Sequence, residues 1–241
     1  ERDKIMNKNS KYTLVMICLN EIDGIKFIAE DVNQHKNLLN DIIFVDGGST
    51  DGSYEKAKEN GWNIILQDKN NMGVLNGINL GLEKCETEYV IFFSPDNNCK
   101  PEAIPALIKE ANKGNDLVIA SRYKDGAKSF DDTIISGFGN YIITKMVNIF
   151  FNSNYTDVLN LYKCIRISML KEMNHEICKK ISGLSTGLCI QCAIHKKKVS
   201  EVGFDEPLRL GGVSKRPIIQ HGYIEISTII IEFIKNIFKK N

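Results

Sequence analysis

Short apolar runs that alternate with segments of helical period constrain the fold of this chain more than any other feature. The five runs occupy residues 13–19, 42–45, 62–66, 89–93 and 116–120. Strands that are apolar at nearly every position are buried on both faces, which is typical of a parallel sheet with helices as the crossovers. The pattern therefore predicts an α/β fold, with a central, mostly parallel sheet flanked by helices.

Polar residues follow three of these runs, at the point where each predicted strand ends. The first run leads into Asn20-Glu21, the second into residues 46–52, and the fourth into Ser94-Pro95-Asp96. The carboxyl ends of parallel strands meet at one edge of the sheet, and ligands of open α/β sheets bind there. Glycines in the second segment let the backbone approach a ligand closely. The convergence predicts an enzyme with a nucleotide site at this edge.

A divalent metal site is predicted after the fourth run. Asp96 and Asn98 stand two residues apart, so two oxygen ligands from one turn can meet one hard cation. Mg²⁺ or Mn²⁺ is expected, with water and substrate phosphates completing the coordination shell. The alternative is an Asx-turn in which both side chains only hold the loop.

Composition narrows the classes of function. Lys and Arg total 31 and Asp and Glu total 30, so the formal net charge is +1 and a nucleic-acid partner is not expected. No apolar run approaches the roughly 20 residues of a membrane-spanning helix and no signal peptide opens the chain, so a cytoplasmic protein is expected. Cys189 and Cys192 are interpreted as reduced core cysteines, with a metal or redox role as the alternative.

Two long apolar helices are predicted in the second half of the chain. Residues 134–151 are interpreted as a core helix, and the alternative is a helix that lies on a membrane surface. Residues 218–240 carry isoleucines with lysines near the end, and could touch lipid as well. Peripheral contact with the cytosolic face of a membrane is therefore an expectation.

The order of the motifs resembles glycosyltransferase family 2. The motifs are Asn20-Glu21, residues 45–51, Asn71-Met72-Gly73, Ser94-Pro95-Asp96 and Ala120-Ser121-Arg122-Tyr123. The resemblance implies the GT-A fold, a Rossmann-like sheet that binds a nucleotide sugar and a divalent metal and inverts the anomeric centre. It implies one domain at residues 6–216, with a nucleotide-sugar half at 12–123 and an acceptor half at 124–216. An amphipathic helical segment follows at 217–241.

One loop resembles the dolichyl-phosphate mannose synthase branch of that family. Residues 209–215 match the Arg-x-x-Gly-x-Ser-Lys loop that engages the phosphates of donor and lipid acceptor there. The resemblance implies that Arg209, Ser214 and Lys215 bind the acceptor phosphate, with Arg209 and Lys215 also acting in catalysis. A forked guanidinium and an ammonium suit phosphate, and the alternative is a solvated basic loop.

The resemblance also assigns residues to the nucleotide sugar. These residues are Glu21, Asp46, Asp51, Gly73, Asp96 and Arg122. Asp46 is expected to touch the base and Glu21 the ribose edge. Alternatively, Asp51 caps the helix that begins near Ser53, and Arg122 forms a structural ion pair. Asp157 is the candidate general base if the acceptor is a sugar hydroxyl.

The chain departs from the family pattern at four places, one of which is the pair Ile17 and Leu19, where relatives carry a proline and an aromatic residue. Gly47 stands where relatives often carry a second aspartate, and Ser94 replaces the first aspartate of the Asp-x-Asp metal motif. Asp96 aligns with the second aspartate and Asn98 with a metal-binding glutamine, so metal binding is expected to survive. Residues 182–195 contain no carboxylate where many relatives place an acid.

The expected function is inverting, metal-dependent transfer of a sugar from a nucleoside-diphosphate sugar to a polyprenyl phosphate of the dolichyl type. An ionised lipid phosphate needs no strong general base, which agrees with the missing acid. The alternatives are a glycan acceptor in capsule or lipopolysaccharide assembly, and a non-catalytic nucleotide-binding module. The sequence predicts no oligomeric state.

Overall fold

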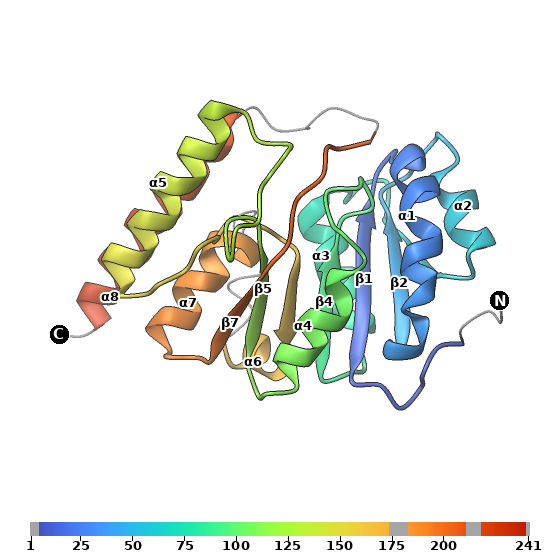
Figure 1. Cartoon of the computed structure of the whole chain (residues 1–241), viewed down its shortest axis with the longest axis horizontal. Coiled ribbons are helices and arrows are strands. Elements are labelled where there is room, and N and C mark those ends of the chain that lie inside the picture. The colour runs from blue at the N-terminus through green and yellow to red at the C-terminus, as the bar shows by residue number, and fades with distance from the viewer. Residues whose placement is uncertain (1–4, 174–182, 211–217, 240–241) are drawn as a thin grey trace.

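The computed structural model describes residues 5–173, 183–210 and 218–239. Within these residues, seven strands form one sheet in the order β3-β2-β1-β4-β6-β5-β7 (Figure 1). The strands are β1 (Tyr12–Cys18), β2 (Asp41–Asp46), β3 (Asn63–Leu66), β4 (Tyr89–Phe93), β5 (Leu117–Ser121), β6 (Lys163–Arg166) and β7 (Val199–Gly203).

The sheet is mostly parallel, as the apolar runs predict. β1 pairs in parallel with both β2 and β4, β2 with β3, and β5 with β7. β6 alone runs antiparallel to its two neighbours, β4 and β5. Because β1, β2 and β4 are adjacent and point the same way, their carboxyl ends bring the three predicted polar loops to one edge.

Helices cover both faces of the sheet. They are α1 (Ile22–Gln34), α2 (Ser53–Glu59), α3 (Val74–Lys84), α4 (Ala103–Ala111), α5 (Ile134–Phe151), α6 (Ile167–Glu172), α7 (Leu188–Ile194) and α8 (Ile218–Lys239), with a 3₁₀ turn η1 (Lys36–Leu38) and a π-helical turn η3 (Gly183–Gly187). Alternate strand residues face opposite sides. Leu14 packs into a core with α1 and α4, and Val15 packs into a second core with α3, α5 and α7.

All five strands expected from apolar runs are present, within one residue at each end, while β6 and β7 were not predicted. β6 opens with Lys163, whose side chain is completely buried and whose Nζ donates to the backbone carbonyl oxygens of Val158 and Asn160. β7 is a half-buried edge strand without an apolar run. The second core also holds Cys189 and Cys192, which are both completely buried, so their predicted core packing is confirmed.

Helix α5 is buried on one side only, so the prediction of a core helix holds for part of its circumference. Ile143, Val147 and Phe151 are buried, whereas Ile134 is 94% exposed and Ile149 is 74% exposed. Among the described residues, α5 is the single helix whose length and apolar composition would allow it to cross a membrane. The composition analysis did not anticipate that property.

Helix α8 packs beside α5. Its polar and apolar residues are distributed differently from those of a helix that faces water, because two of its acids are buried and several of its large apolar side chains are exposed. Phe233 stacks on Phe150 of α5 with ring centroids 4.8 Å apart. Glu225 and Glu232 are turned inward, and are 1% and 9% exposed. Several isoleucines of α8 face outward, with Ile230 45% exposed and Ile234 47% exposed, whereas Ile229 is buried in the second core.

Candidate active site

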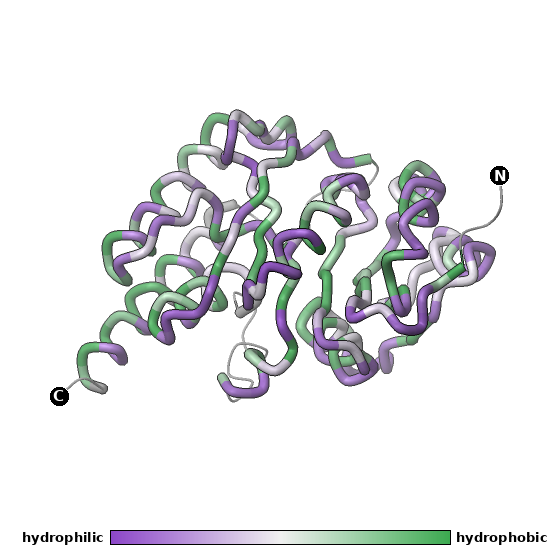
Figure 2. Tube along the Cα trace, turned by 60° about the horizontal axis from the view of Figure 1, so that its bottom comes forward, coloured by the Kyte–Doolittle hydropathy of each residue, from purple (hydrophilic) through white to green (hydrophobic). Residues whose placement is uncertain are grey.

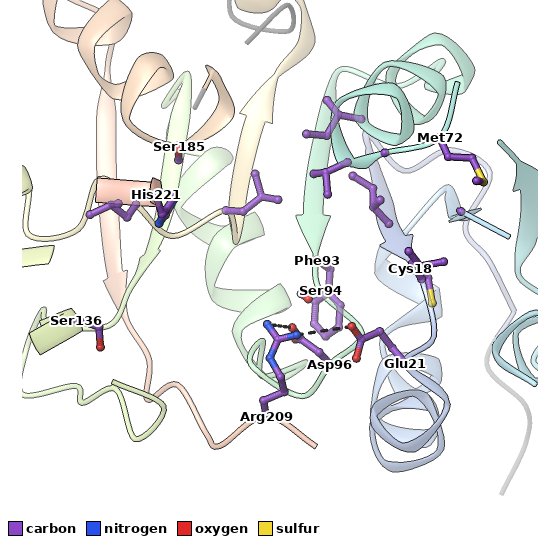
Figure 3. A pocket seen from close by; sticks show the side chains of 18 of the residues that line it. Cys18, Glu21, Met72, Phe93, Ser94, Asp96, Ser136, Ser185, Arg209 and His221 are labelled. Atoms are coloured by element: carbon purple, nitrogen blue, oxygen red, sulfur yellow. Dashed lines mark ion pairs between the residues drawn. The ribbon is translucent and has the colours of Figure 1, made fainter. Parts of the chain in front are cut away.

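A cavity of about 800 Å³ opens at the carboxyl ends of β1, β2 and β4 (Figure 3). Its first wall comes from the loops after these strands and from the start of α3, and includes Glu21, Gly48 and Asp96. Its second wall comes from the first turns of α5 and α8, and includes Asn140 and His221. The cavity therefore joins the predicted donor edge to the two apolar helices.

The loop after β2 is held by the acids that were assigned to the nucleotide. The carboxylate of Asp46 is 2% exposed and accepts hydrogen bonds from the backbone N–H groups of Gly48 and Ser49. Asp51 accepts from the hydroxyl of Ser53 at 2.6 Å and from the N–H of Ile22 at 3.0 Å. Neither acid lines the cavity; the backbone of Gly47 and Gly48 does. This geometry favours loop-holding roles for both side chains.

The hydrogen bonds of Asp51 set its ionisation. Burial by itself raises the pKa of this carboxyl, but the hydrogen bonds from Ser53 and Ile22 outweigh it and hold the pKa below its usual value. Asp51 therefore stays ionised near neutrality, and ties the loop to the start of α1.

Gln67 and Gly73 form the part of the first wall that follows β3. Gln67 is 7% exposed, and its Oε1 accepts from the backbone N–H of Gly73 at 2.8 Å. Gly73 has φ +143°, a conformation that L side chains rarely adopt. The resemblance identified Gly73, but Gln67 was missed. Its position directly after a predicted strand was the available indication.

An ion-pair bridge links two acids of the first wall, Asp96 and Glu21. The guanidinium of Arg209 lies 2.7 Å from Asp96 Oδ2 and 3.6 Å from Glu21 Oε1 (Figure 3). Asp96 is 4% exposed and Glu21 8% exposed. The structure thus brings together three residues that lie far apart in the sequence and that were all assigned to the site.

The loop of Asp96 also fits a hard cation. Asp96 Oδ1 accepts the backbone N–H of Asn98 at 3.1 Å, which is the contact of the Asx-turn given above as the alternative to a metal site. The amide of Asn98 donates to Asp131, whereas its Oδ1 is buried and accepts no hydrogen bond from the described residues. A carboxylate and an unused amide oxygen are ligands that Mg²⁺ and Mn²⁺ accept. The described residues contain no cluster of three or more His, Cys, Asp or Glu around a metal position, so a nucleotide would have to supply further ligands.

Arg122 and Asp157 form a buried ion pair behind the cavity. Arg122 Nε lies 2.7 Å from Asp157 Oδ2, and Nη2 lies 2.9 Å from Oδ1. Asp157 is completely buried, and also accepts backbone N–H groups of Leu159 and Asn160. Neither Arg122 nor Asp157 lines the cavity. The arrangement favours the structural ion pair over a phosphate contact for Arg122 and over a general base for Asp157.

The charge of Arg122 acts differently on its two acidic partners. Burial raises the pKa of Asp157, but the close guanidinium overcomes this and holds the pKa below its usual range. Burial also raises the pKa of Glu206, and there it prevails, since Arg122 Nη1 is 3.4 Å away. The shorter, two-pronged contact to Asp157 is therefore the dominant interaction of Arg122.

Close packing holds the Asp96 loop against α1. A Cβ atom at Gly24 would lie 2.2 Å from the carbonyl oxygen of Pro95 and 2.8 Å from Asp96 Cα. Glycine is therefore required at this position of α1, and the helix fixes the height of the Asp96 loop. Ser214 and Lys215 of the predicted phosphate loop lie outside the described residues.

The sequence matches a known family over most of its length. Residues 13–181 match the family described as Glycosyl transferase family 2. The chain is 24% identical over 203 residues to glycosyltransferase AglJ of Haloferax volcanii, which covers 77% of this chain and 64% of AglJ. It is 24% identical over 184 residues to a dolichol-phosphate mannosyltransferase of Mycosarcoma maydis, which covers 73% of this chain and 60% of that protein. The chain thus spans less than two thirds of the length of these relatives.

A solved structure shares the fold. Glucosyl-3-phosphoglycerate synthase from Mycobacterium tuberculosis, crystallised with Mn²⁺, UDP-glucose and phosphoglyceric acid, superposes with a TM-score of 0.68. The match covers 93% of this chain and 80% of the synthase, at 17% sequence identity. At this identity the likeness concerns the fold alone, and it confirms the predicted GT-A, Rossmann-like architecture.

Proposed function

Since the chain belongs to glycosyltransferase family 2, we propose that it transfers a sugar, with inversion, from a nucleoside-diphosphate sugar to a polyprenyl phosphate. The observation that supports this proposal best is the shape of the cavity, which joins an acidic edge with Arg209 to a wall built from α5 and α8. The first side suits a metal-bound diphosphate, and the second suits an acceptor with an apolar tail. The name of the Mycosarcoma maydis relative points to the same class of acceptor.

The residues of the donor wall have distinct roles in this proposal. Glu21, Gly48 and Gly73 line the part of the cavity that would take the nucleotide. Asp96 and Asn98 would hold Mn²⁺ or Mg²⁺, which neutralises charge on a diphosphate leaving group. Arg209 would contact the phosphates as a second cation, because a guanidinium offers paired donors to phosphate oxygens. Charge stabilisation of the leaving group then carries most of the catalysis.

The outer face of α5 and α8 supports contact with a membrane. Large apolar side chains recur on it, and Figure 2 shows hydrophobic residues along both helices as far as the C-terminal end. Phe138, Tyr141 and Phe238 are 64%, 58% and 75% exposed. A helix that turns carboxylates inward and isoleucines outward suits an apolar surrounding rather than water. We propose that this face rests on the bilayer that holds the lipid acceptor.

The donor site is tested by calorimetric titration with UDP, GDP, CDP and dTDP, each with and without Mn²⁺. We expect one nucleotide to bind with metal, and to lose at least tenfold affinity in Asp96→Ala, because the metal loses its carboxylate ligand. Glu59→Ala is the charge-matched control, since Glu59 pairs with Lys56 away from the cavity. No binding by any nucleotide would contradict the proposal.

The acceptor is tested with the sugar donor of the nucleotide that binds. We expect transfer to a short-chain prenyl phosphate such as geranyl phosphate, detected by mass spectrometry. Transfer to a glycan primer, with none to prenyl phosphate, would contradict the proposed acceptor and favour a glycan acceptor. Nucleotide binding without any transfer would identify a non-catalytic binding module.

A further inference from the structure

A serine, a histidine and a buried glutamate meet at the acceptor wall of the cavity. His221 Nε2 lies 3.2 Å from Glu225 Oε1, and the hydroxyl of Ser185 lies 3.3 Å from the same oxygen. Ser185 and His221 line the cavity, whereas Glu225 does not. In Figure 3, His221 and Ser185 lie across the cavity from Glu21. None of the three residues was identified from the sequence.

Glu225 is placed where a carboxylate is hard to explain by stability alone. It is 1% exposed, and its Oε2 is buried without a hydrogen-bond partner among the described residues. Burying a carboxylate is unfavourable unless other groups compensate for the lost water. The neighbouring outer face of α8 carries isoleucines, so the helix keeps this acid on the side that faces the cavity wall. Its contacts with His221 and Ser185 place its charge beside two residues that line the cavity.

The contact with Glu225 defines what the imidazole can do. When Nε2–H donates to the carboxylate, Nδ1 carries the lone pair and becomes a proton acceptor. A carboxylate in this position also holds the ring in one orientation and stabilises the imidazolium that forms after proton transfer. The ion pair with Glu225 uses Nε2, so Nδ1 is the ring nitrogen left for a proton from the acceptor. The side chain is 37% exposed, so an acceptor can reach it.

The trio also lies where the sequence lacks an acid. Residues 182–195 contain no carboxylate. Ser185 belongs to this segment, and Glu225 contacts it from α8, 40 positions further along the chain. The fold therefore brings to this segment the negative charge that its own sequence does not contain.

We propose that His221, oriented by Glu225, takes the proton from the acceptor. A prenyl phosphate dianion needs no base, but the monoanion still carries a proton: its O–H bond breaks, the proton moves to Nδ1, and the freed oxygen forms a bond to the anomeric carbon. The bond between that carbon and the diphosphate oxygen breaks, the electron pair leaves with the nucleoside diphosphate, and His221 then returns its proton to water. The inference rests on the proposed transfer function. It assigns His221 as a catalytic residue and Glu225 as its positioning residue.

The test compares variants of His221 and Glu225 in the full chain, with Mn²⁺, the nucleotide sugar that binds, and geranyl phosphate. General-base catalysis contributes roughly 10²-fold or more, so we expect His221→Ala to lower kcat by about that factor when the acceptor is the monoanion. Added imidazole should restore part of the rate, because it can occupy the vacated space and accept the proton. Glu225→Gln keeps an oxygen for Nε2–H and should retain more activity than Glu225→Ala.

Two further measurements separate this inference from the proposed function. Nucleotide binding by calorimetry should be unchanged in His221→Ala, so its loss would indicate damage to the donor site. Release of nucleoside diphosphate without any acceptor, where water is the nucleophile, should fall by a similar factor whichever acceptor is correct. Glu232→Gln removes another buried acid of α8 that contacts Gln191 instead, and should leave the rate unchanged. Wild-type rates of transfer and hydrolysis in His221→Ala would overturn the inference.

Discussion

The guanidinium of Arg209 occupies the space between the two carboxylates that face the donor side of the cavity. It contacts Asp96 Oδ2 at 2.7 Å and Glu21 Oε1 at 3.6 Å. A divalent cation that binds Asp96 must share this carboxylate with a positive charge or displace it. Arg209 is therefore expected to influence metal binding even when no nucleotide phosphate is present.

We expect Arg209→Ala to have opposite effects on the metal and on the nucleotide. Mn²⁺ affinity without nucleotide should rise about tenfold, since a nearby positive charge is removed. Nucleotide affinity with Mn²⁺ should fall, because a phosphate ligand is lost. Electron paramagnetic resonance of free Mn²⁺ and calorimetry measure the two affinities. Arg166→Ala is the control, since Arg166 pairs with Glu88 and Asp116 outside the cavity, and unchanged Mn²⁺ affinity in Arg209→Ala would contradict the expectation.

We expect Asp157→Asn to destabilise the protein by about 3 kcal/mol, because it removes the closest and dominant acidic partner of the buried Arg122 charge. The folded-state pKa of Asp157 lies below its usual 3.8, so the stabilisation is fully present above that pH. It is lost as the pH falls from the unfolded value towards the lower folded value. Urea unfolding should therefore show a gap between wild type and variant that narrows below about pH 3.8. An equal gap at all pH values would contradict this account.

Several site residues could be predicted because they stand at strand ends. Glu21 and Asp96 line the cavity for that reason. The same rule cannot tell an acid that faces a ligand from one that holds its own loop, and Asp46 does the latter. His221 was not predictable, because its contact with the cavity depends on how α8 returns to the sheet.

At the scale of elements, α1 packs against the Asp96 loop only because Gly24 has no Cβ atom. We expect Gly24→Ala to destabilise the protein by about 2 kcal/mol and to weaken Mn²⁺-dependent nucleotide binding, since the new methyl group would overlap Pro95. Gly139→Ala in α5 is the matched change, with nothing within 4 Å of the new atom. It should stabilise the fold by roughly 0.5–1 kcal/mol through helix propensity. Thermal unfolding measures the stability of both variants, and calorimetry measures their nucleotide binding. Wild-type stability and binding in Gly24→Ala would show that the Asp96 loop can move to accommodate the methyl group.

The outward isoleucines of α8 give a second prediction at this scale. We expect the wild-type chain to float with liposomes, and the double change Ile230→Glu with Ile234→Glu to abolish flotation by removing apolar contact. Phe27→Glu is the control, because Phe27 is 63% exposed on α1, away from this face. Zwitterionic and anionic vesicles are compared to separate apolar from charge-driven binding. Absence of wild-type protein from both floated fractions would refute the membrane contact.

Elements with long apolar runs could be predicted, and the short mixed ones could not. β1, β2, β4 and β5 are buried on both faces and read as continuous apolar segments, and the edge strand β3 keeps an apolar run although it is only half-buried. β6 lacks that pattern because it begins with a lysine. The charge of Lys163 can be buried only because carbonyl oxygens of the folded chain accept its hydrogen bonds, and the sequence does not reveal those contacts. The burial of the acids of α8 could not be predicted either, since a helical period does not reveal which face of the helix packs against the protein.

At the scale of the whole molecule, the two sides of the cavity depend on different ranges of the chain. The donor wall is built by residues that precede position 100, together with Arg209. The proposed acceptor wall is built by α5, η3 and α8, which lie within residues 134–239. Motifs within the first range were recognisable from local sequence, whereas the second wall exists only after distant helices have packed.

The insertion of β6 between β4 and β5 sets an order for folding during synthesis. β1 to β4 can pair with one another as soon as they have left the ribosome, because each finds a neighbour among them. β5 pairs only with β6 and β7, so its edges stay open until residues 163–203 have emerged. A nascent chain that stalls after β5 would expose an apolar strand to other chains. We expect molecular chaperones to engage the chain at that stage, and translation speed between residues 121 and 163 to affect the yield of folded enzyme.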